Sequence, residues 1–262
     1  MAGVDAGRFE TDTKSSSKPG HAHAVYWSKR YQEKAFEPFD WYLKWEHLKE
    51  LLSSWLSSES VVLIAGCGTS LVAEQMLSEG LASKITCVDQ CAELIASLRE
   101  KYKDKAAMEF EVADASNLPQ DWSDRFDLVL DKALLDTVVA GRQGWASAEG
   151  VLQSLMATLK SSGRYVCVSH ARPAQRLPLL SAVVQDKRRE ISCHQVARPL
   201  DPPPDPKAKT GKAAKGAPDP SSMQAAATDQ KDNVYHIYCC ECQAEAPEPP
   251  PQPAEETTTP EE

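Results

Sequence analysis

Short apolar runs alternate with helical patterns through the middle of this chain, and that alternation constrains the fold more than any other feature. The apolar runs cover residues 61–65, 85–88, 108–112, 126–130 and 165–169. Between them, helical patterns run through Leu71, Met76 and Leu77, through Leu94, Ile95 and Leu98, and from about Ala148 to Leu159. Such an order predicts an α/β fold with a parallel sheet covered by helices on both faces.

The two ends of this alternating region follow different patterns. Before the first run, Trp41, Trp45, Leu48, Leu52 and Trp55 recur at helical spacing, which predicts a helix from about Asp40, with Trp45 and Trp55 packed in the core. After the last run, residues 190–197 and 234–240 read as two further strands. Residues 199–233 between them are rich in Pro, Ala, Lys and Asp, which predicts a flexible insert joining the strands of a hairpin.

Composition sets the expected domain limits and partners. We expect one domain over residues 21–242, a disordered polar segment over 1–20, and a disordered acidic tail rich in Pro, Glu and Thr over 243–262. The formal net charge is −9, but six acidic residues lie in the tail and the rest of the chain is nearly balanced. No basic stripe remains to follow a phosphate backbone, so we expect no nucleic-acid partner.

The sequence carries no sign of export, membrane insertion or metal binding. The first twenty residues include Asp5, Glu10 and Asp12 and lack an apolar run, which disfavours a signal or transit peptide. No stretch reaches the roughly 18 apolar residues of a membrane span. The eight cysteines lack the spacing of a disulfide framework. We expect a cytoplasmic monomer without a metal.

Three successive strand ends carry residues suited to a nucleoside. The first strand runs into Gly66-Cys67-Gly68, a turn that lets a ligand approach the backbone. Asp89 ends the second strand, where an acid accepts hydrogen bonds from ribose hydroxyls. Asp114 follows the third strand, within reach of an adenine amino group. The alternative is that both acids only cap helices.

The nucleoside is better matched by S-adenosylmethionine (SAM) than by a nicotinamide dinucleotide. Dinucleotide sites use a third glycine three residues after the second, and Leu71 stands there instead. The terminal hairpin also leaves no second mononucleotide-binding half. SAM carries a sulfonium cation, which aromatic faces attract, and a dense group of aromatic residues precedes the first strand.

Several motifs resemble those of a known family. They are Tyr26-Trp27-x-x-Arg30-Tyr31, Phe39-Asp40-Trp41-Tyr42, Gly66-Cys67-Gly68-Thr69-Ser70, the segment from Leu130 to Asp136, and the final strand from Val234 to Cys239. Together they resemble the seven-β-strand, class I protein-lysine methyltransferases. The resemblance is greatest to the group that modifies elongation factor 1-alpha and, in a mitochondrial relative, citrate synthase.

The resemblance implies a Rossmann-like sheet of order 3-2-1-4-5-7-6 with strand 7 antiparallel, and SAM as the cofactor. Together with the glycine turn, it implies the following cofactor contacts: Trp27, Tyr31, Trp41, Gly66, Gly68, Asp89, Gln90, Asp114, Ala115 and Lys132. The chain departs from the family at Ala133-Leu134, where Gly-Thr is usual, and at Thr69, where Asn is usual.

The expected reaction is methylation of a lysine in elongation factor 1-alpha or a similar cytosolic protein. No dedicated base is required, because burial and a nearby sulfonium both favour a neutral amine. Asp131 and Asp136 are the candidate residues for orienting an incoming ammonium group, or they cap the following helix. Two other functions stay open: a small-molecule methyltransferase, and a SAM-binding interaction protein without catalysis.

Overall fold

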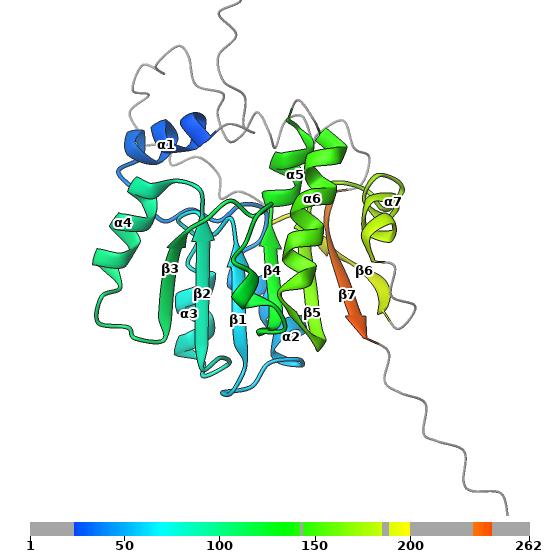
Figure 1. Ribbon diagram of the computed structural model, residues 1–262, viewed down its shortest axis with the longest axis horizontal. Coiled ribbons are helices and arrows are strands. Elements are labelled where there is room, and N and C mark those ends of the chain that lie inside the picture. Colours follow the sequence, from blue (N-terminus) through cyan, green and yellow to red (C-terminus); the bar gives the residue numbers. More distant parts are fainter. Residues whose placement is uncertain (1–23, 142–143, 185–188, 200–232, 243–262) are drawn as a thin grey trace, which may run out of the picture.

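The computed structural model describes residues 24–141, 144–184, 189–199 and 233–242. The strands are β1 (Val61–Ala65), β2 (Lys84–Asp89), β3 (Met108–Val112), β4 (Phe126–Lys132), β5 (Leu159–Ser169), β6 (Arg189–Ala197) and β7 (Val234–Cys242). They form one sheet in the order β3-β2-β1-β4-β5-β7-β6 (Figure 1). This order confirms the predicted fold class.

The first five strands are parallel, and only β7 runs against its neighbours. β1 pairs in parallel with β2 and β4, so the turn after β1 lies at the centre of the sheet's carboxyl edge. β7 is antiparallel to both β5 and β6, as the predicted hairpin requires. Because β1, β2 and β4 are almost wholly buried, they are continuous apolar runs rather than alternating ones.

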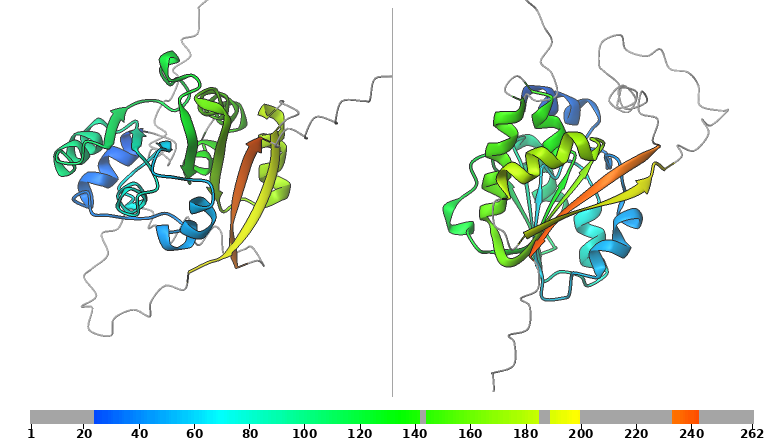
Figure 2. Two further views of the ribbon diagram at one scale, coloured as in Figure 1. Left: turned by 90° about the horizontal axis from the view of Figure 1, so that it is seen from below. Right: turned by 90° about the vertical axis from the view of Figure 1, so that its right-hand side faces the viewer.

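Helices cover both faces of the sheet (Figure 2). On one face, α2 (Trp45–Ser53), α3 (Val72–Ser78) and α4 (Ala92–Lys101) pack into a core with β1 and β2. On the other, α6 (Gly144–Ala157), α7 (Pro173–Val183) and the short 3-10 helix η1 (Gln120–Trp122) pack against β4 and β5. Two further helices, α1 (Ala24–Glu33) and α5 (Leu134–Val139), stand at the carboxyl edge (Figure 1).

The helices α1, α7 and η1 were not predicted, and α5 was expected only as a helix following Asp131 and Asp136, without bounds. Several boundaries also differ: α6 and β5 begin earlier than predicted, and the helix expected from about Asp40 begins at Trp45 in α2. Trp41 lies outside the helix because Tyr42 has a positive φ of 61° and the Leu43 amide donates back to the Trp41 carbonyl at 2.7 Å. This tight turn breaks the helical path before Trp45, which is buried in the core as expected.

The predictions of disordered and flexible segments concern residues that the structure does not describe. The segments expected to be disordered, residues 1–20 and 243–262, and nearly all of the insert 199–233, lie outside the described residues. None of the described helices is both long and apolar enough to span a membrane.

Candidate functional site

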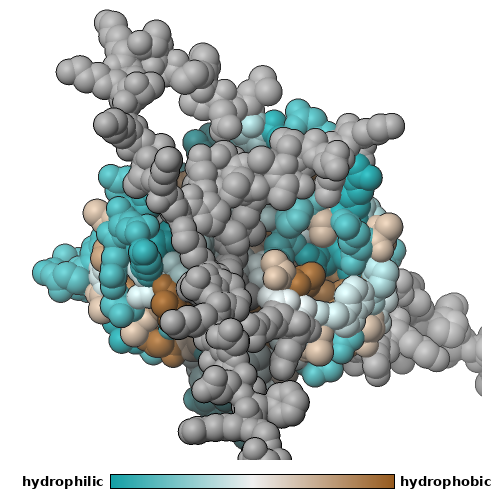
Figure 3. All heavy atoms as spheres, turned by 90° about the horizontal axis from the view of Figure 1, so that it is seen from above, coloured by the Kyte–Doolittle hydropathy of each residue, from teal (hydrophilic) through white to brown (hydrophobic). Residues whose placement is uncertain are grey.

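A cavity of about 450 Å³ lies at the carboxyl edge of the sheet, a volume within the range of about 300–1,000 Å³ for small-molecule sites. Figure 3 looks onto this edge and shows hydrophobic side chains within a mainly hydrophilic surface. All ten residues expected to contact a cofactor line the cavity: Trp27, Tyr31, Trp41, Gly66, Gly68, Asp89, Gln90, Asp114, Ala115 and Lys132. They come from α1, from the segment between α1 and α2, and from the ends of β1, β2, β3 and β4.

The turn after β1 forms the floor of the cavity and requires glycine at two positions. Gly66 and Gly68 have φ angles of +61° and +53°, a left-handed conformation that costs other residues energy. A side chain at Gly66 would also meet the Leu134 Cβ at 3.1 Å, and one at Gly68 would meet the Tyr31 hydroxyl at 3.2 Å. The backbone here is therefore open to a ligand only because both residues are glycine.

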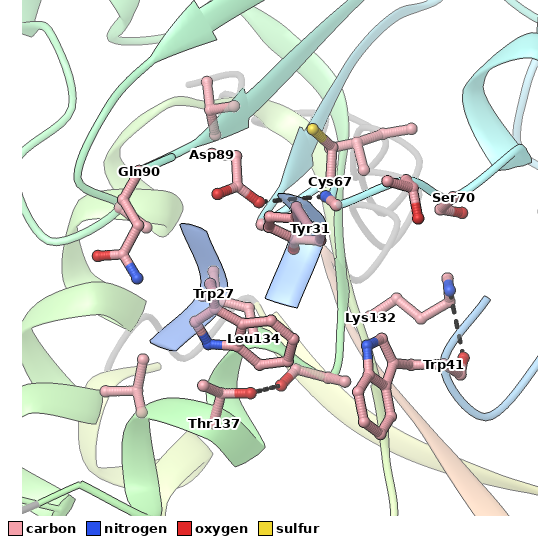
Figure 4. Close-up of a pocket in the computed structure, with 18 of the residues that line it drawn as sticks. Trp27, Tyr31, Trp41, Cys67, Ser70, Asp89, Gln90, Lys132, Leu134 and Thr137 are labelled. Carbon is pink, nitrogen blue, oxygen red and sulfur yellow. Dashed lines mark hydrogen bonds between the residues drawn. The ribbon is translucent and has the colours of Figure 1, made fainter. Parts of the chain in front are cut away.

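Asp89 is the buried acid of the site. Its carboxylate accepts hydrogen bonds from the Gly68 amide at 3.2 Å and the Cys91 amide at 3.0 Å. Burial raises its pKa, and the backbone donors oppose this shift. The bond to Gly68 ties the end of β2 to the turn after β1, so the same carboxylate organises the turn and faces the cavity (Figure 4).

Asp114 is exposed and lies at the next strand end along the same edge. Its Oδ1 accepts hydrogen bonds from the Ser116 amide and hydroxyl, which fixes the turn after β3. This local bonding agrees with the capping alternative, yet the residue also lines the cavity beside Ala115. Asp89 and Asp114 thus place two acids at one end of the cavity, where their chemistry suits the hydroxyl and amino groups of a nucleoside.

Aromatic rings from the N-terminal region cover the cavity. Trp27 and Tyr31, one turn apart on α1, stack with ring centroids 5.8 Å apart, and Trp41 meets Trp27 edge-on at 5.9 Å. Figure 4 shows the three rings around the same space. Burial, followed by the charge of Asp89, raises the pKa of the Tyr31 phenol well above its usual value, so it stays neutral. The rings give the cavity faces that attract a cation.

Lys132 holds the segment that carries Trp41. Its ammonium forms an ion pair with Asp40 at 3.0 Å. The same ammonium donates a hydrogen bond to the Trp41 carbonyl at 3.2 Å (Figure 4). The Ser70 hydroxyl also donates to Asp40, and the Phe39 amide donates to the Thr69 carbonyl at 3.3 Å. The segment is thus tied to β4 and to the turn after β1. Burial lowers the pKa of Lys132, while the charge of Asp40 opposes that shift.

Helix α5 forms an apolar wall of the cavity, which the sequence analysis did not predict. Leu134, Thr137 and Val138 line the cavity from its first two turns, together with Leu130 at the end of β4. Ala133, just before the helix, has a left-handed φ of 74°. Four-residue spacing of apolar side chains was present in the helix, but six residues are too few for that pattern to stand out.

Asp131 and Asp136, the candidates for orienting an ammonium group, do not line the cavity. Asp131 accepts from the Leu134 amide at 2.8 Å and from the Tyr165 hydroxyl at 2.9 Å, so it caps α5 from beneath. Burial raises its pKa to about 6. These bonds agree with the capping interpretation of Asp131.

Asp136 is the centre of a separate buried network. It accepts from the Ser169 hydroxyl at 2.5 Å, from the His170 amide at 3.0 Å and from the Arg176 guanidinium. Burial opposes its ionisation, but His170 and Arg176 outweigh that effect and lower its pKa. The network joins α5 to the segment after β5. In the described part of the chain, no group of three His, Cys, Asp or Glu side chains is arranged to hold a metal.

The donor set suits a nucleoside with a cationic centre. An acid stands where ribose hydroxyls donate, backbone lies open at the glycine turn, and aromatic rings cover the middle of the cavity. SAM has a group that complements each of these: ribose hydroxyls that donate to an acid, a nucleoside that can lie against open backbone, and a sulfonium cation that aromatic rings attract. The residues present therefore fit SAM. Trp27, Tyr31 and Trp41 were expected here because their motifs resemble those of the family, and the aromatic density of the N-terminal region supported them. The ion pair between Asp40 and Lys132 had no signal in the sequence.

Comparison with known proteins gives the same fold and chemistry. Residues 56–239 match the family described as "Methyltransferase domain". The bovine EEF1A lysine methyltransferase 4 is 29% identical over 163 residues, which are 59% of this chain and 63% of that protein. The mouse eEF1A lysine and N-terminal methyltransferase is 30% identical over 195 residues, 72% of this chain and 27% of that protein. These matches therefore span under two thirds of either relative.

Among solved structures, the N-methyltransferase NodS from Bradyrhizobium japonicum, in complex with S-adenosyl-L-homocysteine (SAH), has a similar fold. It is 12% identical, with a TM-score of 0.50 over 76% of this chain and 86% of that protein. At this identity, the likeness concerns the arrangement of the sheet and its helices.

Proposed function

The chain belongs to the methyltransferase domain family, and we propose that it transfers the methyl group of SAM to a lysine side chain of a cytosolic protein, elongation factor 1-alpha being the first candidate. One observation carries this proposal: the acids Asp89 and Asp114, three aromatic rings and the apolar wall of α5 all line the same cavity. The cofactor is SAM, which supplies an electrophilic methyl group when bound.

The protein's part in the reaction is to hold the nucleoside and to balance charge around the sulfonium. Asp89 and Asp114 stand at the nucleoside end, and the faces of Trp27 and Trp41 stand where a cation is favoured. The ammonium of Lys132 would repel a sulfonium, but its ion pair with Asp40 offsets that charge.

The apolar wall favours a neutral amine as the acceptor. A free lysine has a pKa near 10.4, so removing its proton at about pH 7.4 costs roughly 4 kcal/mol. Leu130, Leu134 and Val138 line the cavity beyond the glycine turn and strip water from an entering side chain. Burial among them, next to a positive sulfonium, lowers the pKa of the amine. Asp131 and Asp136 do not line the cavity, so neither of these two carboxylates favours the charged form of the amine.

Support for a protein lysine as the acceptor comes from the relatives. Both named relatives are described as lysine methyltransferases of elongation factor 1-alpha, and this chain is 29% and 30% identical to them over the matched residues. We place the protein in the cytoplasm as a monomer, with a protein rather than a nucleic acid or a membrane as its partner.

The test is to incubate the purified full-length protein with methyl-labelled SAM and a cytosolic extract. We expect label on one dominant protein band, which mass spectrometry then assigns to a lysine. Purified elongation factor 1-alpha, as wild type and with the labelled lysine changed to arginine, identifies the target. An Asp89→Ala variant is the control, because it should lose cofactor affinity and leave the extract unlabelled.

The outcomes separate the alternatives. Label on small molecules alone would replace the proposal by a small-molecule methyltransferase. SAM binding in calorimetry with no label in any fraction would favour an interaction protein without catalysis. A labelled protein other than elongation factor 1-alpha would keep the lysine chemistry and replace only the target.

A further inference from the structure

Arg30 is a cation at the cavity without an ionic partner. Three cationic side chains of the described residues line the cavity: Arg30, Lys34 and Lys132. Lys132 is neutralised by Asp40, and Lys34 is exposed to solvent. Arg30 is half-buried, and among residues 24–141, 144–184, 189–199 and 233–242 it forms no ion pair with a carboxylate.

Aromatic rings hold the Arg30 guanidinium in place. Its Cζ lies 5.6 Å from the centroid of the Phe39 ring and 5.5 Å from that of the Trp41 ring. Both rings belong to the segment tied down by Lys132 and by the bond from the Phe39 amide to Thr69. Contacts with rings do not use up the N–H donors of a guanidinium. Arg30 hydrogen-bonds the Tyr26 side chain, and its remaining N–H groups can bind a planar anion such as a carboxylate.

Arg30 also stands at the end of the cavity opposite to the nucleoside acids. Asp89 and Asp114 mark the ends of β2 and β3, at one side of the sheet edge. Trp41 is tied to the end of β4 and Phe39 to the turn after β1, so the guanidinium that contacts them lies on the other side. SAM has one anionic group, the carboxylate of its methionine part, at the far end from its adenine.

We infer that Arg30 binds the methionine carboxylate of SAM. This inference rests on the proposed function, because it takes the cavity to be the cofactor site. Lys132 is a poorer candidate for this contact, since its ammonium already serves Asp40 and the Trp41 carbonyl. Lys34 follows the last residue of α1 and is exposed, where solvent screens its charge.

The test compares two ligands that differ at the group in question. SAH is the unreactive product of SAM, and 5′-methylthioadenosine shares its nucleoside and thioether but has no amino acid. Calorimetry on the full-length protein gives the affinity of each ligand for the wild type and for Arg30→Met. We expect the substitution to weaken SAH binding by about 10- to 100-fold and methylthioadenosine binding by less than about 2-fold.

Two further variants sharpen the comparison. Arg30→Lys keeps the charge but not the planar fork, so its loss of SAH affinity should fall between those of the wild type and Arg30→Met. Lys34→Met removes the neighbouring cation and should leave both affinities within about 2-fold. Thermal unfolding followed by circular dichroism confirms that each variant is folded.

Each other outcome overturns the inference in a distinct way. Equal weakening of both ligands by Arg30→Met would reduce Arg30 to a packing role between Phe39 and Trp41. Selective loss of SAH affinity in Lys34→Met but not in Arg30→Met would move the carboxylate site to Lys34. Wild-type protein that binds neither ligand would refute the cofactor site itself, and with it the proposed function.

Discussion

Replacing Lys132 by methionine tests how the aromatic cover is held over the cavity. The Lys132 and Asp40 side chains are only 7% and 9% exposed, and their charged groups are 3.0 Å apart. Methionine keeps much of the length and apolar contact but leaves a nearly buried carboxylate whose remaining side-chain partner is the Ser70 hydroxyl. Breaking a buried pair from one side costs about 3–5 kcal/mol. Because Asp40 lies in a loop that can detach, we expect a loss near the lower end, about 3 kcal/mol.

The assay is urea unfolding followed by circular dichroism, combined with SAH titration. The matched control is Lys103→Met, which removes an exposed ion pair with Glu100 at 2.9 Å and should change the unfolding free energy by less than about 0.5 kcal/mol. The double variant Lys132→Met/Asp40→Leu should recover more than half of the loss, because no unpaired charge remains. SAH affinity should fall with Lys132→Met, since Trp41 loses its anchor. A loss as small as that of the control would refute the reasoning.

Three further predictions concern the floor of the cavity and the acid beneath α5. Gly66→Ala should destabilise the protein by about 1 kcal/mol more than Gly80→Ala and should weaken SAH binding. Both glycines have a positive φ, but only a side chain at Gly66 would meet Leu134. Equal loss of stability in the two variants would exclude this steric contribution. Asp89→Asn should cost about 1–3 kcal/mol of SAH affinity by calorimetry, and an unchanged affinity would remove Asp89 from the ribose site. Burial raises the pKa of Asp131 to about 6, so ionising it in the folded protein costs stability as the pH rises from about 4, its unfolded value. The unfolding free energy of Asp131→Asn minus that of the wild type should therefore increase from about pH 4 to about pH 6 and stay constant above pH 6. A difference that does not change with pH would contradict the raised pKa.

The sheet and the nucleoside end of the site followed from local sequence. Continuous apolar runs predict buried parallel strands, because a strand covered on both faces has no polar side. Gly66, Asp89 and Asp114 stand directly after such runs, and the carboxyl ends of parallel strands share one edge. The positions of the strands therefore sufficed to predict that these three residues lie close together. The glycine turn by itself would fit several ligands.

Contacts between distant segments were decided only by the tertiary structure. Lys132 bonds the carbonyl of a residue 91 positions earlier, and no spacing rule links a strand end to the loop that carries Trp41. The same bond, with the tight turn at Tyr42, keeps Trp41 out of the helix that its sequence spacing predicted.

The direction in which a charged side chain points was also beyond the sequence. Asp131 and Lys132 are neighbours in β4, so the alternation of a strand sends one beneath α5 and the other toward the cavity. Which face receives which residue depends on the packing of both helix layers. Local patterns in the sequence thus determined the fold and the position of the cavity, while long-range packing decided which charged side chains line the cavity and which are neutralised within the protein.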